Sequence, residues 1–62
     1  MLLTKDHARK VRRKRADLML TKKATAQILG IKSQTLNKVE QGDYDAPRRI
    51  YESVMNWLLE DL

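Results

Sequence analysis

The sequence has no cysteine, a single histidine, one proline and two glycines among its 62 residues. Without cysteine the chain can form neither a disulfide nor a thiolate metal site, and one histidine cannot build a histidine-rich metal cluster. No apolar run approaches the roughly 20 residues that a membrane-spanning helix needs. The first residues also lack the apolar segment of a secretory signal peptide. We therefore expect one small cytoplasmic domain that uses no metal or cofactor and does not enter a membrane.

The residue sets that enzymes use for catalysis are missing as well. No serine–histidine–aspartate set, carboxylate pair or glycine-rich phosphate loop stands out. His7 is expected to be a surface residue, not a ligand or a pH switch. We therefore expect a binding protein that is not an enzyme, with the small core that a chain of this length can bury.

The charge is divided unevenly along the chain. The first 32 residues hold ten lysines and arginines against two aspartates, whereas the remaining 30 hold three against six acidic residues. The first part therefore has a net charge of +8 and the second a net charge of −3. This separation favours a polyanion as the partner of the first part, and solvent or another protein beside the acidic second part.

Residues 21–42 form the segment around which the rest of the chain is interpreted. Two short helical patterns flank Gly30, which can adopt the positive φ of a tight turn between helices without steric cost. The small side chain of Ala26 lets a second helix cross closely, and Leu36 and Val39 give that helix an inward edge. These features predict a helix-turn-helix unit. Its outward face carries polar side chains of types that contact base edges, namely Ser33, Gln34, Asn37 and Lys38.

Four helices are predicted in a single domain that spans residues 1–62. Their expected bounds are about 5–18, 22–29, 33–41 and 47–60. Pro47 suits the first turn of the last helix. Residues 1–3 are expected either to fray or to fold back onto the core, and residues 43–46 to form a polar connection.

The first helix combines an apolar face with a high density of positive charge. Thr4 is expected to be its N-cap. The inward face at helical spacing consists of Ala8, Val11, Arg15 and Leu18. Arg15 needs a partner there, because a buried charge without one is costly. The other faces carry like charges that repel one another, so they are either solvated or attract phosphates; they are Arg9, Lys10, Arg12, Arg13 and Lys14.

The last helix carries two adjacent rows of residues at helical spacing. The first row consists of Ile50, Val54, Trp57, Leu58 and Asp61, and the second of Tyr51, Met55, Leu58 and Leu62. Two rows make a face wider than a small three-helix core can cover. The side chains that belong either to the core or to a dimer or partner surface are Tyr51, Met55, Trp57 and Leu58.

Together these residues resemble the lambda-repressor-like helix-turn-helix family of phage repressors, Cro proteins and small bacterial regulators. The resemblance covers roughly residues 11–47, and its specific residues are Val11, Arg15, Leu18, Leu20, Thr21, Ala26, Gly30, Ile31, Leu36, Val39, Glu40, Gln41 and Gly42. The family implies an all-α fold of four or five helices, in which residues 57–59 are either a shortened fifth helix or part of one long fourth helix. The family usually has a larger apolar residue at the position of Thr25, so the second helix is expected to pack less well here.

The resemblance also implies roles for individual residues. Arg15 and Glu40 stand where the family has a buried or half-buried salt bridge, which would give Arg15 its partner. The four polar residues of the third helix match the base-facing positions of the family, whereas the alternative is a solvated polar face. Phosphate contacts are expected from the start of the second helix, where N–H groups and positive charge suit an anion, and from nearby residues. The expected phosphate contacts are Thr21, Lys22, Lys32, Gln41, Arg48 and Arg12.

We therefore expect a sequence-specific, duplex DNA-binding transcriptional regulator of the phage or prophage Cro/repressor type. It would act by occupying an operator, in the bacterial cytoplasm or nucleoid or in the host cytoplasm. The extra apolar face of the last helix favours a homodimer on a pseudo-palindromic site. The alternative is an interaction module, such as an antirepressor or an antitoxin-like partner of another regulator protein, with weak or indirect DNA binding. A general nucleoid or RNA-binding protein is disfavoured, because Tyr44, Tyr51 and Trp57 all lie outside the basic half.

Overall fold

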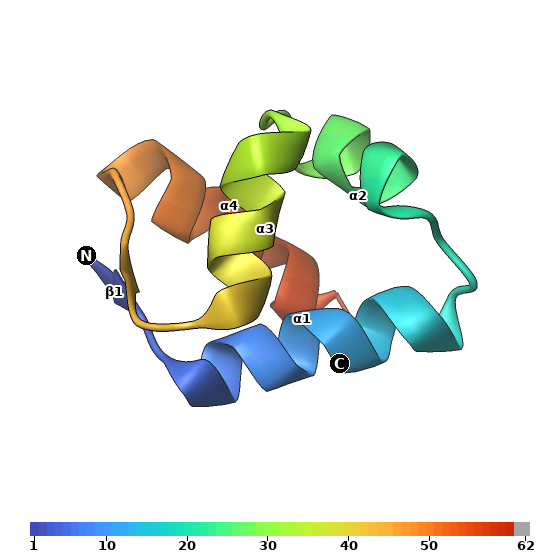
Figure 1. Ribbon diagram of the computed structural model, residues 1–62, viewed down its shortest axis with the longest axis horizontal. Coiled ribbons are helices and arrows are strands. Elements are labelled where there is room, and N and C mark those ends of the chain that lie inside the picture. The colour runs from blue at the N-terminus through green and yellow to red at the C-terminus, as the bar shows by residue number, and fades with distance from the viewer. Residues whose placement is uncertain (61–62) are drawn as a thin grey trace.

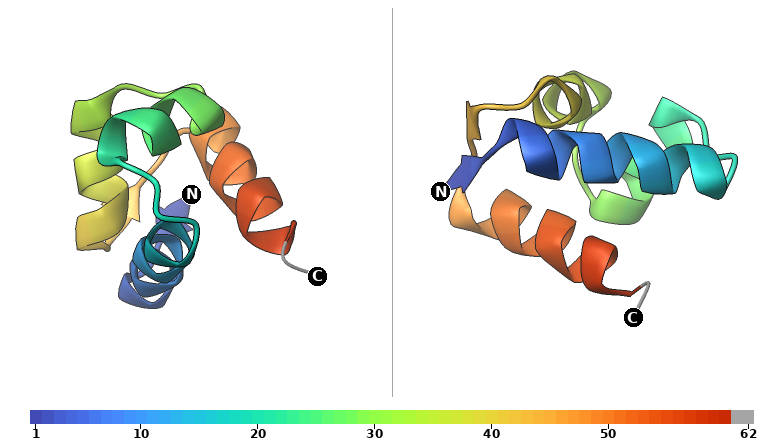
Figure 2. Two further views of the ribbon diagram at one scale, coloured as in Figure 1. Left: turned by 90° about the vertical axis from the view of Figure 1, so that its right-hand side faces the viewer. Right: turned by 90° about the horizontal axis from the view of Figure 1, so that it is seen from below.

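The expectation of a mainly helical protein is confirmed. The computed structural model describes residues 1–60, and its elements in chain order are β1 (Leu2–Leu3), α1 (Lys5–Asp17), α2 (Lys22–Leu29), α3 (Ser33–Gln41), β2 (Tyr44–Asp45) and α4 (Arg48–Leu59). Helix α1 runs along one side of the molecule, α3 lies across it, and α4 lies behind α3 (Figure 1). Seen from below, α1 lies between α3 and α4 (Figure 2).

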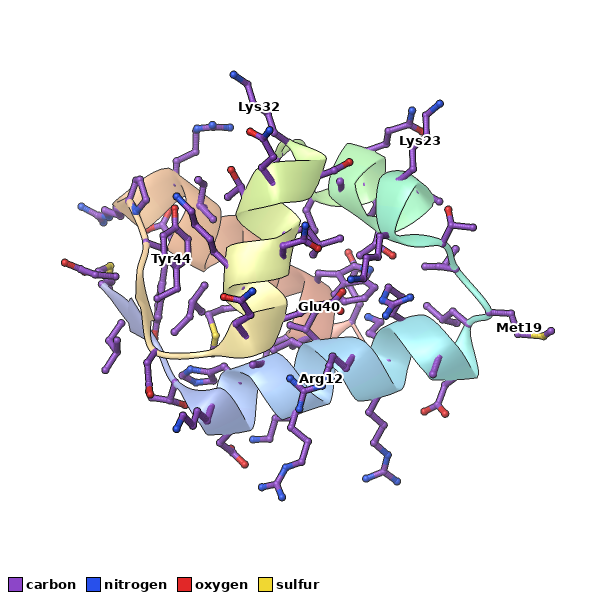
Figure 3. The ribbon with its side chains drawn as sticks, viewed as in Figure 1. Arg12, Met19, Lys23, Lys32, Glu40 and Tyr44 are labelled. Atoms are coloured by element: carbon purple, nitrogen blue, oxygen red, sulfur yellow. The ribbon has the colours of Figure 1, made fainter. Side chains whose placement is uncertain are left out.

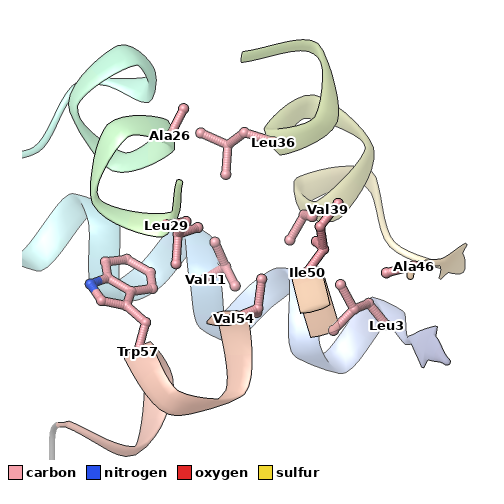
Figure 4. Packing of buried hydrophobic residues seen from close by; sticks show 10 residues of the cluster. All are labelled: Leu3, Val11, Ala26, Leu29, Leu36, Val39, Ala46, Ile50, Val54 and Trp57. Carbon is pink, nitrogen blue, oxygen red and sulfur yellow. The ribbon is translucent and has the colours of Figure 1, made fainter. Parts of the chain in front are cut away.

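One cluster of buried apolar side chains joins all four helices (Figure 4). Each helix contributes to it, for example through Val11 of α1, Leu29 of α2, Leu36 of α3 and Val54 of α4. Helices of 8 to 13 residues are marginal in isolation. The shared core is therefore what stabilises all of them. The complete cluster consists of Leu3, Val11, Ala26, Leu29, Leu36, Val39, Ala46, Ile50, Val54 and Trp57.

Helix α1 begins with a reciprocal cap in which His7 takes part. The backbone N–H of His7 donates to Thr4 Oγ1 at 3.2 Å, and the backbone N–H of Thr4 donates to His7 Nδ1 at 3.1 Å. This arrangement satisfies two N–H groups that the start of a helix otherwise leaves open. Thr4 is the N-cap, as expected. His7 was expected to be a surface residue, but it is half-buried and helps to cap the helix.

The inward position predicted for Leu18 is wrong. Helix α1 ends at Asp17, and Leu18 is its C-cap with 52% of its surface exposed. Met19 adopts a φ of +55°, and the backbone N–H of Leu20 donates to Arg15 O at 2.9 Å. The chain therefore turns away from α1 before the side chain of Leu18 can reach the core.

Lys14 is the second correction to the expected faces of α1. It was expected on a charged face that is either solvated or bound to phosphates, but only 6% of its surface is exposed. Its Nζ atom donates to the backbone carbonyl of Trp57 and lies 4.6 Å from the centre of the Trp57 ring. Because α4 packs against Lys14, this side chain belongs to the buried face of α1.

A tight turn at Gly30 joins α2 to α3. Gly30 has a φ of +69°, and the backbone N–H of Ile31 donates to Ala26 O at 2.9 Å. Thr25 is fully buried, and its hydroxyl donates to Thr21 O at 2.9 Å. A threonine can therefore stand where a larger apolar side chain was expected, because its one polar group has a partner inside the helix.

Residues 43–46 do more than form a polar connection. Strands β1 and β2 pair antiparallel, with Leu2 opposite Asp45 and Leu3 opposite Tyr44. The N-terminal residues thus fold back onto the core, and Leu3 is fully buried. Alternation over two residues is too short to reveal a strand. The small sheet was therefore missed, and the fold is helical with one short strand pair.

The choice between core and partner surface on α4 is settled for Trp57. Its side chain is 4% exposed and packs in the core, which is the first of the two alternatives for this residue. Tyr51, Met55 and Leu58 are half-buried and pack against the cluster from outside.

Helix α4 is a single helix over the described residues. Pro47 is its N-cap, so the helix begins at Arg48, one residue after the expected start. Residues 57–59 belong to α4 itself, so the described chain holds no separate fifth helix in that segment. Asp61 and Leu62, which ended the two expected rows, lie outside the described residues.

Candidate nucleic-acid interface

Helix α3 presents a polar face to solvent. Leu36, Val39 and Glu40 are turned inward and buried. The exposed side chains of the helix are Ser33, Gln34, Asn37, Lys38 and Gln41. The structure therefore brings the four expected base-reading residues, together with Gln41, onto one face of one helix.

Helix α3 is held against α1 by Arg15 and Glu40. Arg15 Nε donates to Glu40 Oε2 at 2.9 Å, and Arg15 Nη2 donates to Glu40 Oε1 at 3.2 Å. Glu40 is 6% exposed and the Arg15 side chain 24%. Two parallel hydrogen bonds to a buried carboxylate fix the orientation of both groups. The inward position of Arg15 is thereby explained, and the end of α3 is fastened to α1.

Arg12 adds a second link between the same two helices. Its Nη1 atom donates to the backbone carbonyl of Glu40, and Figure 3 shows the two labelled residues between α1 and α3. Carbonyls in the last turn of a helix lack partners within the helix and carry its partial negative charge. Arg12 was expected at a DNA phosphate. In the structure it supports the end of α3, while its side chain stays exposed.

The start of α2 lies beside α3 and carries the other expected phosphate contacts. Thr21 is the N-cap, and its Oγ1 accepts from the backbone N–H of Ala24 at 3.0 Å. Lys22 is exposed, and its Nζ donates to Asn37 Oδ1 at 3.2 Å. A residue expected at a phosphate thus contacts a residue expected at a base. Lys23, which was not singled out from the sequence, is exposed at the same end of α2.

Two further lysines lie on α3 or at its start. Lys32 is the N-cap of α3 but makes no capping hydrogen bond through its side chain, as its residue type predicts. Its side chain projects outward near the upper end of the helix in Figure 3. Lys38 Nζ lies 5.9 Å from the centre of the Tyr44 ring, which limits the directions that this side chain takes.

Arg48 stands apart from these groups on another helix. It is the first residue of α4, and its Nε donates to Glu52 Oε1 at 2.9 Å on the same helix. Both side chains are more than half exposed. The guanidinium charge of Arg48 is therefore partly balanced within α4, unlike that of the exposed lysines of α2 and α3.

Two members of the basic run in α1 form exposed ion pairs within their own helix. Arg9 Nη2 lies 2.8 Å from Asp6 Oδ1, and Lys10 Nζ lies 3.2 Å from Asp6 Oδ2. The hydrogen bonds from Arg9 and then Lys10 hold the pKa of Asp6 below its ordinary value of 3.8. Part of the dense positive charge is thus balanced locally.

Two more members of the run, Arg12 and Lys14, donate hydrogen bonds to backbone carbonyls of α3 and α4. Arg13 is the member for which no partner is described within residues 1–60. The run was expected to be either solvated or bound to phosphates. Its contacts show a third use, because Arg12 and Lys14 link α1 to the rest of the fold.

The described residues contain no group of three or more histidine, cysteine, aspartate or glutamate side chains that could hold a metal ion. Within residues 1–60 no helix is both long and apolar enough to cross a membrane. Comparison with protein-family models, with curated proteins and with solved structures found no match to this chain.

Proposed function

We propose that the chain is a sequence-specific, duplex DNA-binding transcriptional regulator of the lambda-repressor-like type, with α2 and α3 as its helix-turn-helix. The observation that carries the proposal is the outward face of α3, where Ser33, Gln34, Asn37 and Lys38 are exposed together. The major groove of DNA admits an α-helix, and amide and ammonium side chains donate to and accept from its base edges. A helix rigidly held on its inner side is suited to this use, because the reading side chains start from fixed positions.

The neighbourhood of α3 supports contacts to the DNA backbone. The start of α2 offers Lys22, Lys23 and backbone N–H groups, and Lys32 lies at the start of α3. N–H groups at helix starts and lysine ammoniums are common phosphate ligands. Occupation of an operator that overlaps a promoter would then repress transcription by steric exclusion, as in a Cro-like repressor. The affinity would fall steeply with salt, because phosphate contacts release counterions.

The proposal includes a homodimer formed through the outer side of α4. Tyr51, Met55 and Leu58 are half-buried there, and the next residue, Leu59, is 56% exposed. Apolar side chains left partly uncovered on a helix are typical of a dimer surface. A two-fold dimer would bind a pseudo-palindromic operator. The mass of the protein on operator DNA, measured by light scattering, should be that of two chains per site. One chain per site would exclude the dimer.

The test of direct base reading is selection of bound sequences from a random duplex pool, followed by gel shifts with excess nonspecific DNA. The wild-type protein should enrich one sequence and retain it against competitor. The double variant Gln34→Ala, Asn37→Ala should lose that retention but keep weak, salt-sensitive binding. Gln27→Ala is the matched control, because Gln27 is an exposed glutamine on α2, outside the face of α3. Retention unchanged in the double variant would contradict base reading.

A second candidate function is an interaction module that binds another regulator protein. The observation that favours it is the number of exposed apolar side chains, which include Leu18 at 52%, Met19 at 90% and Leu59 at 56% exposed. In that case the selection would enrich no sequence. Substitution of the apolar groups with serine would then abolish partner binding, while the α3 variants would leave it unchanged.

A further inference from the structure

One side chain of the outward face of α3 is already fastened before any ligand binds. Lys22, the first residue of α2, donates from Nζ to Asn37 Oδ1 at 3.2 Å, across a separation of 15 residues in the chain. Both residues are exposed, so the contact lies on the same side of the protein as the polar face of α3. No comparable hydrogen bond is described for the side chains of Ser33, Gln34 or Gln41 within residues 1–60.

The contact determines which end of the Asn37 carboxamide is turned toward α2. The oxygen accepts from Lys22, so the nitrogen is turned away from it. A carboxamide recognises adenine by donating from its nitrogen to N7 and accepting at its oxygen from N6, which requires one order of the two atoms. An amide that rotates freely presents both orders, and binding must then select one of them at an entropic cost.

The ammonium of Lys22 can hold Asn37 without losing its attraction for DNA. An ammonium group has three donors, and the carboxamide oxygen has two lone pairs. One donor to Asn37 Oδ1 leaves two for a phosphate at the start of α2, and the second lone pair of the oxygen stays free for a base. A single lysine can therefore connect a backbone contact to a base contact.

We propose that Lys22 is a positioning residue for base recognition, which sets the orientation of the Asn37 carboxamide and so contributes to sequence discrimination without touching a base. The proposal rests on the proposed function, because it takes α3 as the reading helix. It separates Lys22 from Lys23, the next residue of α2, which is exposed and for which no hydrogen bond or ion pair is described. Lys23 can add affinity for phosphates, but it has no link to a reading residue.

The test measures base preference, not affinity alone. Bound sequences are first selected with the wild-type protein, and the base pair contacted by Asn37 is identified as the one whose preference disappears in Asn37→Ala. Affinities for the four bases at that position are then measured for Lys22→Met, which keeps the length of the side chain but removes its donors. The matched variants are Lys22→Arg, which restores donors, and Lys23→Met. Thermal melts verify that all variants are folded. We expect them to be, because Lys22 and Lys23 are exposed and their substitution leaves the core intact.

We expect Lys22→Met to reduce the preference at the Asn37 position on the order of tenfold, the discrimination that one good side-chain contact to a base provides. Lys22→Arg should restore most of it, and Lys23→Met should lower affinity for all four bases alike. A uniform loss of affinity in Lys22→Met with the preference intact overturns the positioning role and makes Lys22 a phosphate contact only. If the wild-type protein prefers particular bases but Asn37→Ala changes none of these preferences, Asn37 reads no base, and the positioning role of Lys22 is overturned as well. If the wild-type protein prefers no base at any position, the proposed function itself fails, and this inference with it.

Discussion

The Nζ atom of Lys14 lies 4.6 Å from the centre of the Trp57 ring and donates a hydrogen bond to the backbone carbonyl of the same residue. It also lies 3.9 Å from Glu60 Oε2. A lysine that is 6% exposed is tolerated because its charge and its proton donors have partners. The contact joins the last turn of α1 to the end of α4, two elements that are far apart in the sequence.

Replacement of Lys14 should therefore destabilise the fold. We expect Lys14→Ala to lower the free energy of unfolding by about 2 kcal/mol, because the stem no longer packs and the carbonyl of Trp57 loses a donor. Lys14→Met keeps the stem and should cost less. Urea unfolding followed by the fluorescence of Trp57, the single tryptophan of the chain, measures both. Arg13→Ala is the control and should change stability by less than about 0.5 kcal/mol; an equal effect of Arg13→Ala and Lys14→Ala would contradict this assignment.

Lys14 also shows why part of the fold could not be predicted. The positions of the helices follow from local features, such as the N-cap at Thr21 and the glycines at 30 and 42, and these features do not depend on distant residues. Which flank of α1 becomes buried depends instead on where α4 packs, and no periodicity within α1 contains that information. The exposure of Leu18 has the same origin, because the turn at Met19 directs the chain away from the core.

Some features of the candidate site could likewise be predicted from the sequence, and others could not. The outward face of α3 could be predicted, because apolar Leu36 and Val39 at helical spacing leave the opposite side to polar residues. The hydrogen bond between Lys22 and Asn37 could not, because it depends on how α2 crosses α3. The link from Arg12 to the carbonyl of Glu40 was hidden for the same reason.

The ion pair between Arg15 and Glu40 should contribute strongly to stability. Glu40→Gln keeps the shape of the side chain but leaves Arg15 partly buried without its counter-charge, so we expect a loss of about 2 kcal/mol. Arg15 is 24% exposed, which keeps the loss below that of a fully buried pair. Glu52→Gln removes the partner of Arg48 in a pair that is more than half exposed, and should cost less than about 1 kcal/mol. A thermal melt unchanged by Glu40→Gln would contradict the buried pair.

The two glycines offer a matched pair of substitutions. Gly42 has a φ of +90°, and a Cβ atom there would lie 2.8 Å from Lys5 Cα, closer than real contacts allow. Gly30 has a φ of +69°, but a Cβ atom at Gly30 would meet no atom within 4 Å. We therefore expect Gly30→Ala to cost about 1 kcal/mol from backbone strain alone. Gly42→Ala should cost about 3 kcal/mol or more, because α1 must also move. Calorimetric melting temperatures should fall further for Gly42→Ala; equal shifts would show that Lys5 gives way easily.

Asp6 should make stability depend on pH in the acid range. Arg9 and Lys10 hold its pKa in the folded protein below the ordinary value of 3.8, so folding favours the ionised form. This contribution is complete above the unfolded pKa and is lost as the pH falls through the folded pKa. The difference in stability between wild type and Asp6→Asn should therefore be constant above about pH 5 and shrink toward zero below about pH 3. A difference that grows on acidification would have the wrong sign for this ion pair.

Lys23 and Arg13 distinguish charge that faces DNA from charge that does not. Lys23 is exposed at the start of α2, whereas Arg13 lies on α1 and lines a hollow beside Leu58 of α4. A lysine at a phosphate weakens binding to all sequences alike when it is removed, and it lowers the slope of log affinity against log salt concentration by about one. Lys23→Ala should show both effects, and Arg13→Ala neither, in fluorescence anisotropy titrations at several salt concentrations. An unchanged slope in Lys23→Ala together with a reduced slope in Arg13→Ala would place the DNA against α1, and the proposed orientation of α3 would then be wrong.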